Sequence, residues 1–413
     1  MQGNKLNIFL WLLIFIGLQS ANQWSEFPIG NTYTEWIAST IILLFGYRLI
    51  TEQNIQKDKK NYIPVVLFLC WAVIGAIRGA YVAENYWEYK NLVYAVFASS
   101  LPFFVYIFAS PLVVGKFYRL WIRVCLPLFF VFFFWVITPG EVNFYLAPIF
   151  VLGCFMPMMP KGWRFVIVAL LAFMLVADLG ARSQVLKAAF AFAMSGACLL
   201  HRFIRTSWLR ITHWTIYAAT VILLVLGITG RFNIFTDLTP NEKIVYHKTQ
   251  TGEISEENVY SDTRTFIYLE VFASAIRNDY LIFGRTLARG NDSAYFGAFL
   301  GDDLKTGKYE RHSNELLHLN ILTWLGLVGV FLYSLIYIRG SWLAVYRSKN
   351  FYVKLMGIFV AFHWAYGWVE DFNRFDIQNI ALWSVIAMSY SSKFRAMTDA
   401  EFRGWFRGVF ISR

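Results

Sequence analysis

The fold is decided by residues 312–338, HSNELLHLNILTWLGLVGVFLYSLIYI, in which a short polar beginning leads into a long apolar run. The run Leu316–Ile338 is long enough to cross the hydrocarbon core of a bilayer as a helix, which takes about 20 residues. Similar runs recur along the whole chain of 413 residues, of which 58% are hydrophobic and 15% are charged. Soluble domains carry about 25% charged residues. The sequence therefore predicts an all-α polytopic membrane protein.

Twelve transmembrane helices account for the apolar runs, and we expect residues 1–413 to form a single membrane domain. The predicted spans are 6–20, 33–50, 62–83, 91–113, 120–137, 145–158, 165–178, 184–200, 211–229, 316–338, 355–369 and 377–391. Lysines and arginines concentrate in the even-numbered connections and in the tail 392–413, as they do in cytoplasmic segments. Both termini are therefore expected in the cytoplasm. The net charge of +11 then reflects topology rather than nucleic-acid binding.

Each end of the chain leaves an alternative open. Lys5 followed by Leu6–Leu18 resembles a signal peptide, but we prefer an uncleaved first span. Helical spacing of aromatic and apolar residues over Phe402–Phe410 predicts an amphipathic helix on the inner leaflet, with a disordered basic tail as the alternative.

The connection 230–315, between the ninth and tenth spans, is the one long loop on the outer side of this topology. Most connections are short, and long loops tend to carry function. Apolar residues recur in it at three- and four-residue spacing, which predicts an amphipathic helix of about five turns, capped by Ser261 or Asp262. These residues are Phe266, Leu269, Phe272 or Ala273, Ile276 and Tyr280. The next helix is expected to begin near Ser313 or Asn314.

Arg264 lies in the first turn of the predicted loop helix. A cation is unfavourable there unless the guanidinium and the free backbone N–H groups share an anion, and a diphosphate suits them both. Pairing with Asp262 or Glu270 is the alternative interpretation.

Three further basic residues lie at membrane depth on the outer side. Arg182 begins a span four residues after Asp178, Lys187 lies one turn deeper, and Arg78 sits within the third span. Charges at this depth are costly and are usually functional or paired. Arg182 is therefore either functional or a structural partner of Asp178, and Lys187 adds to the positive potential beside it. The alternative for Arg78 is a side chain that extends to the outer interface.

His312 is the histidine best placed for chemistry, because it precedes the tenth span within the sequence Glu310 to Glu315. A histidine near its unperturbed pKa can act as a general base, and either of these glutamates can orient it. An ordinary interfacial histidine is the alternative.

The remaining polar clusters have simpler interpretations. Asp302-Asp303 and the group Glu370, Asp371, Arg374 and Asp376 are expected in solvated turns, although paired carboxylates can also bind a divalent ion or act as bases. None of these residues, nor the four cysteines, has the spacing of a metal site, so no metal and no cofactor are expected.

Four features together resemble the O-antigen polymerase and ligase superfamily (the Wzy and WaaL type). The first is about twelve spans with a large periplasmic loop before the third-last span. The motif-level features are Gly180-Ala181-Arg182-Ser183; Asp262-Thr263-Arg264 ahead of an amphipathic helix that ends in Leu281-Ile282-Phe283-Gly284; and His312-Ser313-Asn314-Glu315 leading into Leu325-Gly326-Leu327-Val328-Gly329. The chain departs from the family pattern in a longer distance from His312 to Gly326 and in Asp279-Tyr280, where the family often has proline.

The resemblance implies a metal-independent glycosyl transfer on the periplasmic face of the bacterial inner membrane, with a glycan on undecaprenyl diphosphate as donor. By this analogy Arg182 and Arg264 hold the diphosphate, and His312 positions or deprotonates the acceptor hydroxyl. The candidate substrate-binding residues are Arg78, Lys187, Arg285, Arg289, Asn314 and Glu315. The implied partners are the lipid-linked oligosaccharide, membrane lipids, and a chain-length regulator or other polysaccharide-assembly proteins.

The leading hypothesis is a polymerase of surface-polysaccharide repeat units. An O-antigen ligase that transfers the chain to lipid A-core is the closest alternative, because it uses the same donor. A transporter or flippase of lipid-linked oligosaccharide is the alternative from another class, but the sequence shows no pair of related halves.

Overall fold

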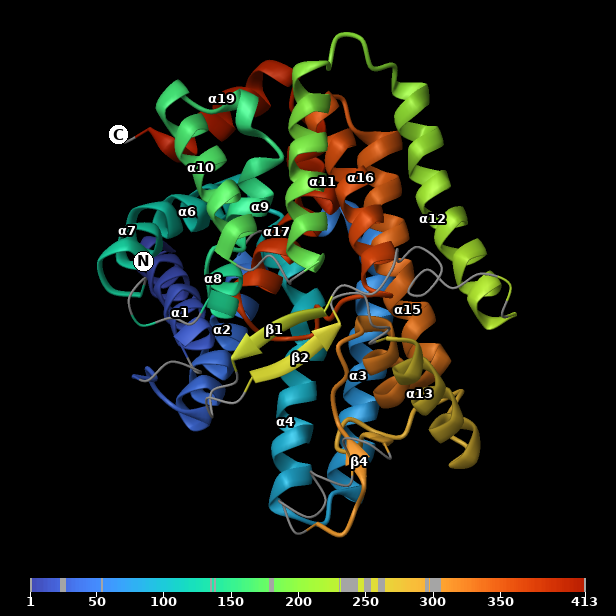
Figure 1. Cartoon of the computed structure of the whole chain (residues 1–413). Coiled ribbons are helices and arrows are strands. Elements are labelled where there is room, and N and C mark those ends of the chain that lie inside the picture. Colours follow the sequence, from blue (N-terminus) through green and yellow to red (C-terminus); the bar gives the residue numbers. More distant parts are fainter. Residues whose placement is uncertain are drawn as a thin grey trace.

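The computed structural model of the chain (Figure 1) describes all residues except 1, 23–26, 53–54, 134–135, 137–138, 178–181, 230, 232–243, 249–253, 259–263, 294–296, 298–305 and 412–413. The described part is helical apart from two short antiparallel strand pairs. These are β1 (Ile244–Lys248) with β2 (Ile254–Asn258), and β3 (Asn291–Asp292) with β4 (Glu310–Arg311).

The helices are α1 (Gln2–Asn22), α2 (Thr32–Glu52), α3 (Ile63–Val82), α4 (Tyr86–Ser100), α5 (Phe104–Ile107), α6 (Pro111–Leu120), α7 (Leu126–Leu128), α8 (Pro139–Tyr145), α9 (Pro148–Gly153), α10 (Lys161–Ala177), α11 (Arg182–Leu199), α12 (Thr206–Ile228), α13 (Thr265–Arg277), α15 (Leu317–Arg347), α16 (Phe351–Tyr366), α17 (Ile377–Tyr390), α18 (Ser392–Ala396) and α19 (Asp399–Phe410). One hydrophobic core joins residues from α1 to α19.

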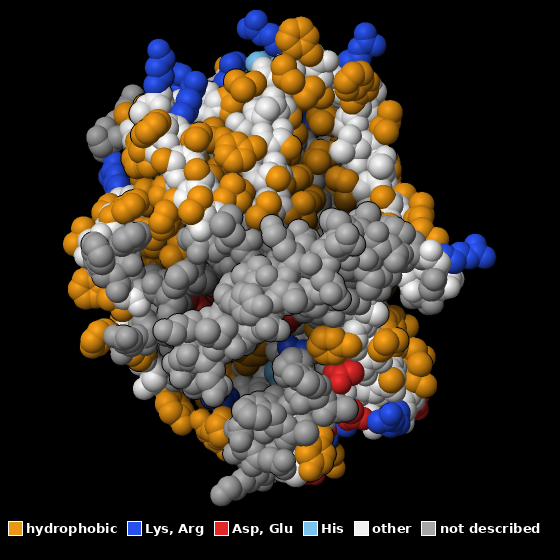
Figure 2. Space-filling model, in the orientation of Figure 1, with side chains coloured by type: hydrophobic (Ala, Val, Ile, Leu, Met, Phe, Trp, Pro, Cys, Tyr) orange, Lys and Arg blue, Asp and Glu red, His pale blue; other side chains and the backbone are white. Residues whose placement is uncertain are grey.

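The prediction of an apolar, helical protein is confirmed. Four described helices are long and apolar enough to cross a membrane, namely Lys59–Val82, Tyr86–Ile107, Thr206–Gly227 and Leu317–Arg347. Hydrophobic side chains cover much of the flank in Figure 2, and lysines and arginines gather at the end of the molecule where α19 lies.

Three of the predicted spans are not continuous helices, because each contains proline. The segment 91–113 breaks into α4, a 3-10 turn over Leu101–Phe103, α5 and α6. The segment 120–137 contains two π-helical stretches that flank α7, and 145–158 contains only α9 and a 3-10 turn. Proline lacks the N–H that continues the helix, so the ladder shifts or ends at these positions.

The tail forms a helix, as predicted, but its apolar face lies on the protein. In α19, Phe402, Phe406 and Val409 are buried, and Trp405 donates to the carbonyl of Pro111 over 2.9 Å. Thr398 and Glu401 form a capping box that fixes the start of the helix. The inner-leaflet contact that the spacing suggested is therefore replaced by packing against α6 and its neighbours.

The loop helix is confirmed as α13, but it is shorter than expected and presents another face. Ile267 and Val271 are buried against the first half of α15, whereas Leu269 and Ile276 of the predicted stripe are 67% and 69% exposed. Both faces of α13 carry apolar residues, so periodicity alone does not choose between them. Arg264 is the N-cap residue, and the expected caps Ser261 and Asp262 lie outside the described residues.

The helix α15 is broken at Gly326, where the backbone adopts φ 69° inside an otherwise helical run. Residues 281–285, the part of the long loop that follows α13, fill the break. Leu327 and Val328 donate their N–H groups to the carbonyls of Leu281 and Ile282 over 2.9 and 3.2 Å, and Arg285 donates its N–H to Thr323 over 2.7 Å. The backbone groups that the break frees are thus satisfied by another segment, as they must be at membrane depth.

Two side chains of α3 also bind at the break in α15, where residues 281–285 lie, and we call this set of contacts the joint. Trp71 donates its indole N–H to the carbonyl of Leu325 over 2.9 Å. Arg78 donates to the carbonyls of Phe283 and Gly284 over 2.8 and 3.0 Å. The joint therefore connects α3, α15 and residues 281–285. The helices α3 and α15 lie side by side in Figure 1.

We expect Gly326→Ala to destabilise the protein by at least about 1–3 kcal/mol, because alanine is strained at this φ and its Cβ would overlap the carbonyl of Ile282. The unfolding temperature of the purified protein in detergent is the measurement. Gly196→Ala is the matched control, since a Cβ there meets nothing within 4 Å and alanine suits a helix better than glycine. Equal stability of the two variants would contradict the role of the joint.

Candidate active site

A cavity of about 590 Å³ lies beside the first half of α15. Its lining comes from the start of α2, one face of α4, Phe144, Arg264 at the start of α13, residues 311–315 and residues 370–379. Small-molecule sites are typically about 300–1,000 Å³. The cavity is therefore large enough for a ligand, and charged side chains from five separate segments line it.

Three arginines line the cavity, and they differ in how they are paired. Arg264 and Arg311 both bind the carboxylate of Glu315, Arg311 over 3.3 Å. The guanidinium of Arg374 makes no hydrogen bond or ion pair with any residue that the structure describes. Arg374 is thus the one arginine of the cavity lining that no described ion pair holds, although its charge still interacts with the carboxylates of Glu35 and Asp376.

The half-buried Asp371 is a carboxylate of the cavity with an unusual pKa. Asp371 accepts from the backbone N–H of Asn373 over 3.0 Å and from Asn320 over 3.2 Å, both through Oδ1. Within the described residues its Oδ2 accepts nothing. Burial raises the pKa of Asp371 to about 7, although both hydrogen bonds act to lower it. Asp376 caps α17 through the N–H of Asn379 at 2.8 Å.

His312 lies one layer behind the cavity wall. Its Nε2 is 3.0 Å from the carbonyl of Leu287, so Nε2 carries the proton and Nδ1 is the acceptor. The ring stacks on Trp324 and meets Tyr94 edge-on. Burial lowers the pKa of His312 to about 4, against the raising effects of the Leu287 carbonyl and Glu310.

The expected orienting carboxylate of His312 is absent from the described contacts. Glu310 binds Arg285 over 3.0 Å and Arg289 through Nε over 2.8 Å, and Glu315 binds Arg264 and Arg311. The prediction that either glutamate orients the histidine was therefore wrong, because both are consumed by arginines and a backbone carbonyl holds the ring.

Asn314, a predicted substrate-binding residue, lines the cavity and ties its parts together. Its backbone N–H donates to Asn320 over 2.6 Å, and its side chain donates to Asn291 over 2.8 Å. Since Asn320 also donates to Asp371, this network links the loop, α15 and residues 370–376.

Arg78, Arg285 and Arg289, also predicted to bind substrate, lie outside the cavity lining. Arg78 clamps the joint in α15, and Arg285 forms ion pairs with Asp292 over 2.7 Å and with Glu310. Arg289 is paired with Glu310. Each of the three arginines therefore has a structural role. Arg78 binds backbone carbonyls instead of extending to the outer interface, and Arg285 and Arg289 form ion pairs that the sequence did not reveal.

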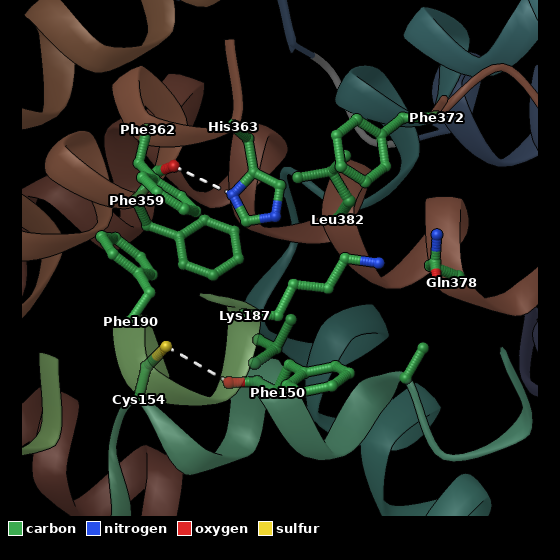
Figure 3. A pocket seen from close by; sticks show the side chains of 12 residues that line it. Phe150, Cys154, Lys187, Phe190, Phe359, Phe362, His363, Phe372, Gln378 and Leu382 are labelled. Atoms are coloured by element: carbon green, nitrogen blue, oxygen red, sulfur yellow. Dashed lines mark hydrogen bonds between the residues drawn. The ribbon is translucent and has the colours of Figure 1, made fainter. Parts of the chain in front are cut away.

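Lys187 lies behind the cavity rather than in it. Its ammonium lines a second, much smaller cavity of about 30 Å³ with Gln378 and Phe372, as Figure 3 shows. The Nζ atom is 3.9 Å from Glu370 and has no hydrogen bond within the described part of the chain, and the Lys187 side chain is 6% exposed. Glu370 and Gln378 line the large cavity as well. Lys187 therefore interacts with Glu370, a residue of the cavity wall, and does not itself line the large cavity.

Arg182 is the predicted catalytic residue whose side chain lies outside the described part. Its backbone begins α11, and Lys187 on the same helix reaches Glu370. The predicted carboxylate pair Asp302-Asp303 also lies outside the described residues. Among those that are described, no three His, Cys, Asp or Glu side chains cluster as a metal site.

Sequence reasoning underrated residues 370–376, which it placed in solvated turns. The structure instead buries Asp376 and brings Asp371 and Arg374 to the cavity. The available signal was the presence of four charged residues between two apolar spans. Lys90, Tyr94 and Arg311 carried no comparable signal, because each is ordinary in its own segment.

No family model, curated protein or solved structure matches the chain. The function of the cavity is therefore argued from its chemistry.

We expect Lys187→Met to destabilise the protein by about 1–3 kcal/mol, because the partly buried carboxylate of Glu370, which is 19% exposed, then loses its compensating charge. The double variant Lys187→Met/Glu370→Gln should recover most of the loss, since it removes both charges. Unfolding temperatures of the single and double variants, with exposed Lys161→Met as control, give the coupling. Additive losses would show that the two side chains do not act as a pair.

Proposed function

We propose that this protein is a multi-pass glycosyltransferase of the bacterial inner membrane. It polymerises oligosaccharide repeat units carried on undecaprenyl diphosphate, at a site on the periplasmic face. The observation that carries the proposal is a ligand-sized cavity lined by Arg264, Arg311 and Arg374. Among the described residues, the guanidinium of Arg374 forms no hydrogen bond and no ion pair.

The arginines suit the leaving group. When the bond between the sugar C1 and its phosphate oxygen breaks, the electron pair stays on the diphosphate, whose negative charge increases. Guanidinium groups bind phosphate oxygens through two parallel hydrogen bonds. Positive groups already held in place stabilise such developing charge better than groups that must first reorganise.

The acceptor requires a base. As its hydroxyl oxygen forms the new bond to C1, the hydroxyl proton must leave, and Asp371 is the group best suited to take it. Asp371 lines the cavity with a free Oδ2, and a pKa of about 7 lies near the working pH, where general bases are most effective. His312, with a pKa of about 4 and its N–H held by Leu287, is a positioning residue for the wall at 311–313.

The surroundings suit a lipid-linked substrate. Leu269 and Ile276 on the outer face of α13 are exposed, as are Ile282 and Phe283 at the joint and Phe331 on α15. Exposed apolar side chains of this kind are stable when they face lipid. A helix that starts with a cavity-lining arginine and carries an apolar outer face allows the diphosphate and the hydrocarbon chain to bind on the same element. The basic end at α19 is then the cytoplasmic side of the twelve-span topology.

We expect Arg374→Ala and Arg264→Ala each to lower the rate of transfer at least about 100-fold, as the loss of one charge-stabilising donor commonly does. Arg182→Ala tests the sequence-based assignment in the same way. The assay follows elongation of lipid-linked oligosaccharide by purified protein on a gel. Exposed Arg277→Ala, at the far end of α13, is the control and should retain activity. Full activity of both cavity variants at normal expression would remove the proposed diphosphate site.

The pH profile separates the two candidate bases. With Asp371 as base, kcat/KM should rise with pH and level off above an apparent pKa of about 7, because the protonated carboxyl cannot accept a proton. Asp371→Asn should remove this dependence and lower the rate about 100-fold or more. If His312 were the base, the profile would already be flat above about pH 5. A flat profile through pH 7, or normal activity of Asp371→Asn, would contradict the assignment to Asp371.

The polymerase and the ligase share the donor, so the product in cells distinguishes them. A gene deletion should leave single-unit glycans if the protein polymerises, whereas it should leave unattached lipid-linked polymer if the protein is a ligase.

A further inference from the structure

The cavity has a second wall that the diphosphate chemistry does not use. Glu35 and Trp36 come from the first turns of α2, and Lys90, Tyr94 and Phe97 follow one another along one face of α4. This wall combines aromatic rings with a carboxylate and an ammonium, and it contains no arginine. We propose that it is a saccharide subsite that binds a neutral pyranose ring of the acceptor glycan.

The polar groups of this wall are available to a ligand. Glu35 is partly buried, and its carboxylate makes no hydrogen bond or ion pair with any described residue. Lys90 likewise has no ion pair among them, and its ammonium lies 5.0 Å from the centre of the Trp87 ring. A partly buried carboxylate without a hydrogen-bond donor is costly. Hydroxyl groups of a sugar supply such donors, and Lys90 can donate to their oxygens.

The aromatic residues suit the other part of a sugar ring. Trp36 is partly buried, contacts Tyr33 edge-on at 5.7 Å, and leaves part of its surface to the cavity. A pyranose has an apolar face of C–H groups with hydroxyls around its edge. The electron-rich face of an indole attracts those C–H groups. Trp36 beside Glu35 therefore offers stacking and hydrogen bonding on adjacent residues.

The charges argue against a phosphate at this wall. Glu35 would repel an anion, whereas Arg264 and Arg311 attract one from other segments of the lining. Arg374 interacts with Glu35 itself, so its charge is partly offset on the side of this wall. Tyr94 connects this wall to the segment 311–315, because its ring contacts the ring of His312, which stands between the lining residues Arg311 and Ser313. In the proposed function, on which this inference rests, the acceptor sugar would bind here with its hydroxyl directed toward Asp371.

Three probes test the subsite and the proposed function separately on the full-length protein in detergent. They are undecaprenyl diphosphate alone, the lipid-linked oligosaccharide extracted from the host, and the free oligosaccharide released from it by mild acid. Thermal stabilisation at a series of probe concentrations gives an affinity for each. Trp36→Leu and Glu35→Gln are the test variants, and Trp208→Leu, at an exposed position on α12 outside the cavity lining, is the matched control.

We expect the free oligosaccharide to bind Trp36→Leu and Glu35→Gln about tenfold more weakly than wild type or Trp208→Leu, as for the loss of one stacking contact or one charged hydrogen bond. Binding of undecaprenyl diphosphate alone should not change in these variants and should weaken in Arg374→Ala. Unchanged binding of the free oligosaccharide to both wall variants, or no binding to wild type, overturns the subsite. Failure of undecaprenyl diphosphate alone to bind wild type overturns the diphosphate site instead.

Discussion

The break in α15 at Gly326, filled by residues 281–285, is the interaction on which the rest of the site depends. A helix at membrane depth can be interrupted only if other groups satisfy its free N–H and C=O groups. Here residues 281–285 of the long loop do so, and Trp71 and Arg78 reinforce the contact from α3. The loop is thereby fixed at one point of the helical scaffold.

From this joint the chain returns to the cavity through a series of fixed contacts. Arg285 and Arg289 hold Glu310, and β3 pairs with β4, so the backbone at 310–311 is defined. Leu287 then holds the ring of His312. Arg285 and Arg289, which the sequence predicted to bind substrate, thus hold the backbone that carries Arg311 and Asn314.

The first half of α15 also fixes residues 370–376, which line the cavity together with residues 311–315. The N–H of Leu317 donates to the carbonyl of Glu370 over 3.1 Å, and Asn373 donates back to the carbonyl of Leu317 over 3.1 Å. Asn320 adds a bond to Asp371. One half-helix therefore sets the relative positions of Asp371, Arg374 and the loop, through one backbone–backbone bond and the side-chain amides of Asn320 and Asn373.

Much of this arrangement was accessible from the sequence. Apolar runs gave the helices, three- and four-residue spacing gave α13, and Arg264 was singled out because a cation opposes the dipole at a helix start. Non-local contacts were not accessible. The local pattern does not predict that Gly326 meets Ile282 or that Glu310 binds Arg285 instead of His312. It also does not predict that Arg374 forms no ion pair with the residues that the structure describes. The exposed stripe of α13 was misassigned for a related reason, because an amphipathic pattern does not distinguish lipid from protein core.

A structure of the full-length protein with undecaprenyl diphosphate, determined by electron cryo-microscopy in a lipid nanodisc, tests the central claim most directly. The account predicts that the two phosphates lie in the cavity within hydrogen-bonding distance of Arg264, Arg311 and Arg374, with the hydrocarbon chain leaving along the outer face of α13. Phosphates bound elsewhere on the protein, with these three guanidinium groups uninvolved, would contradict it.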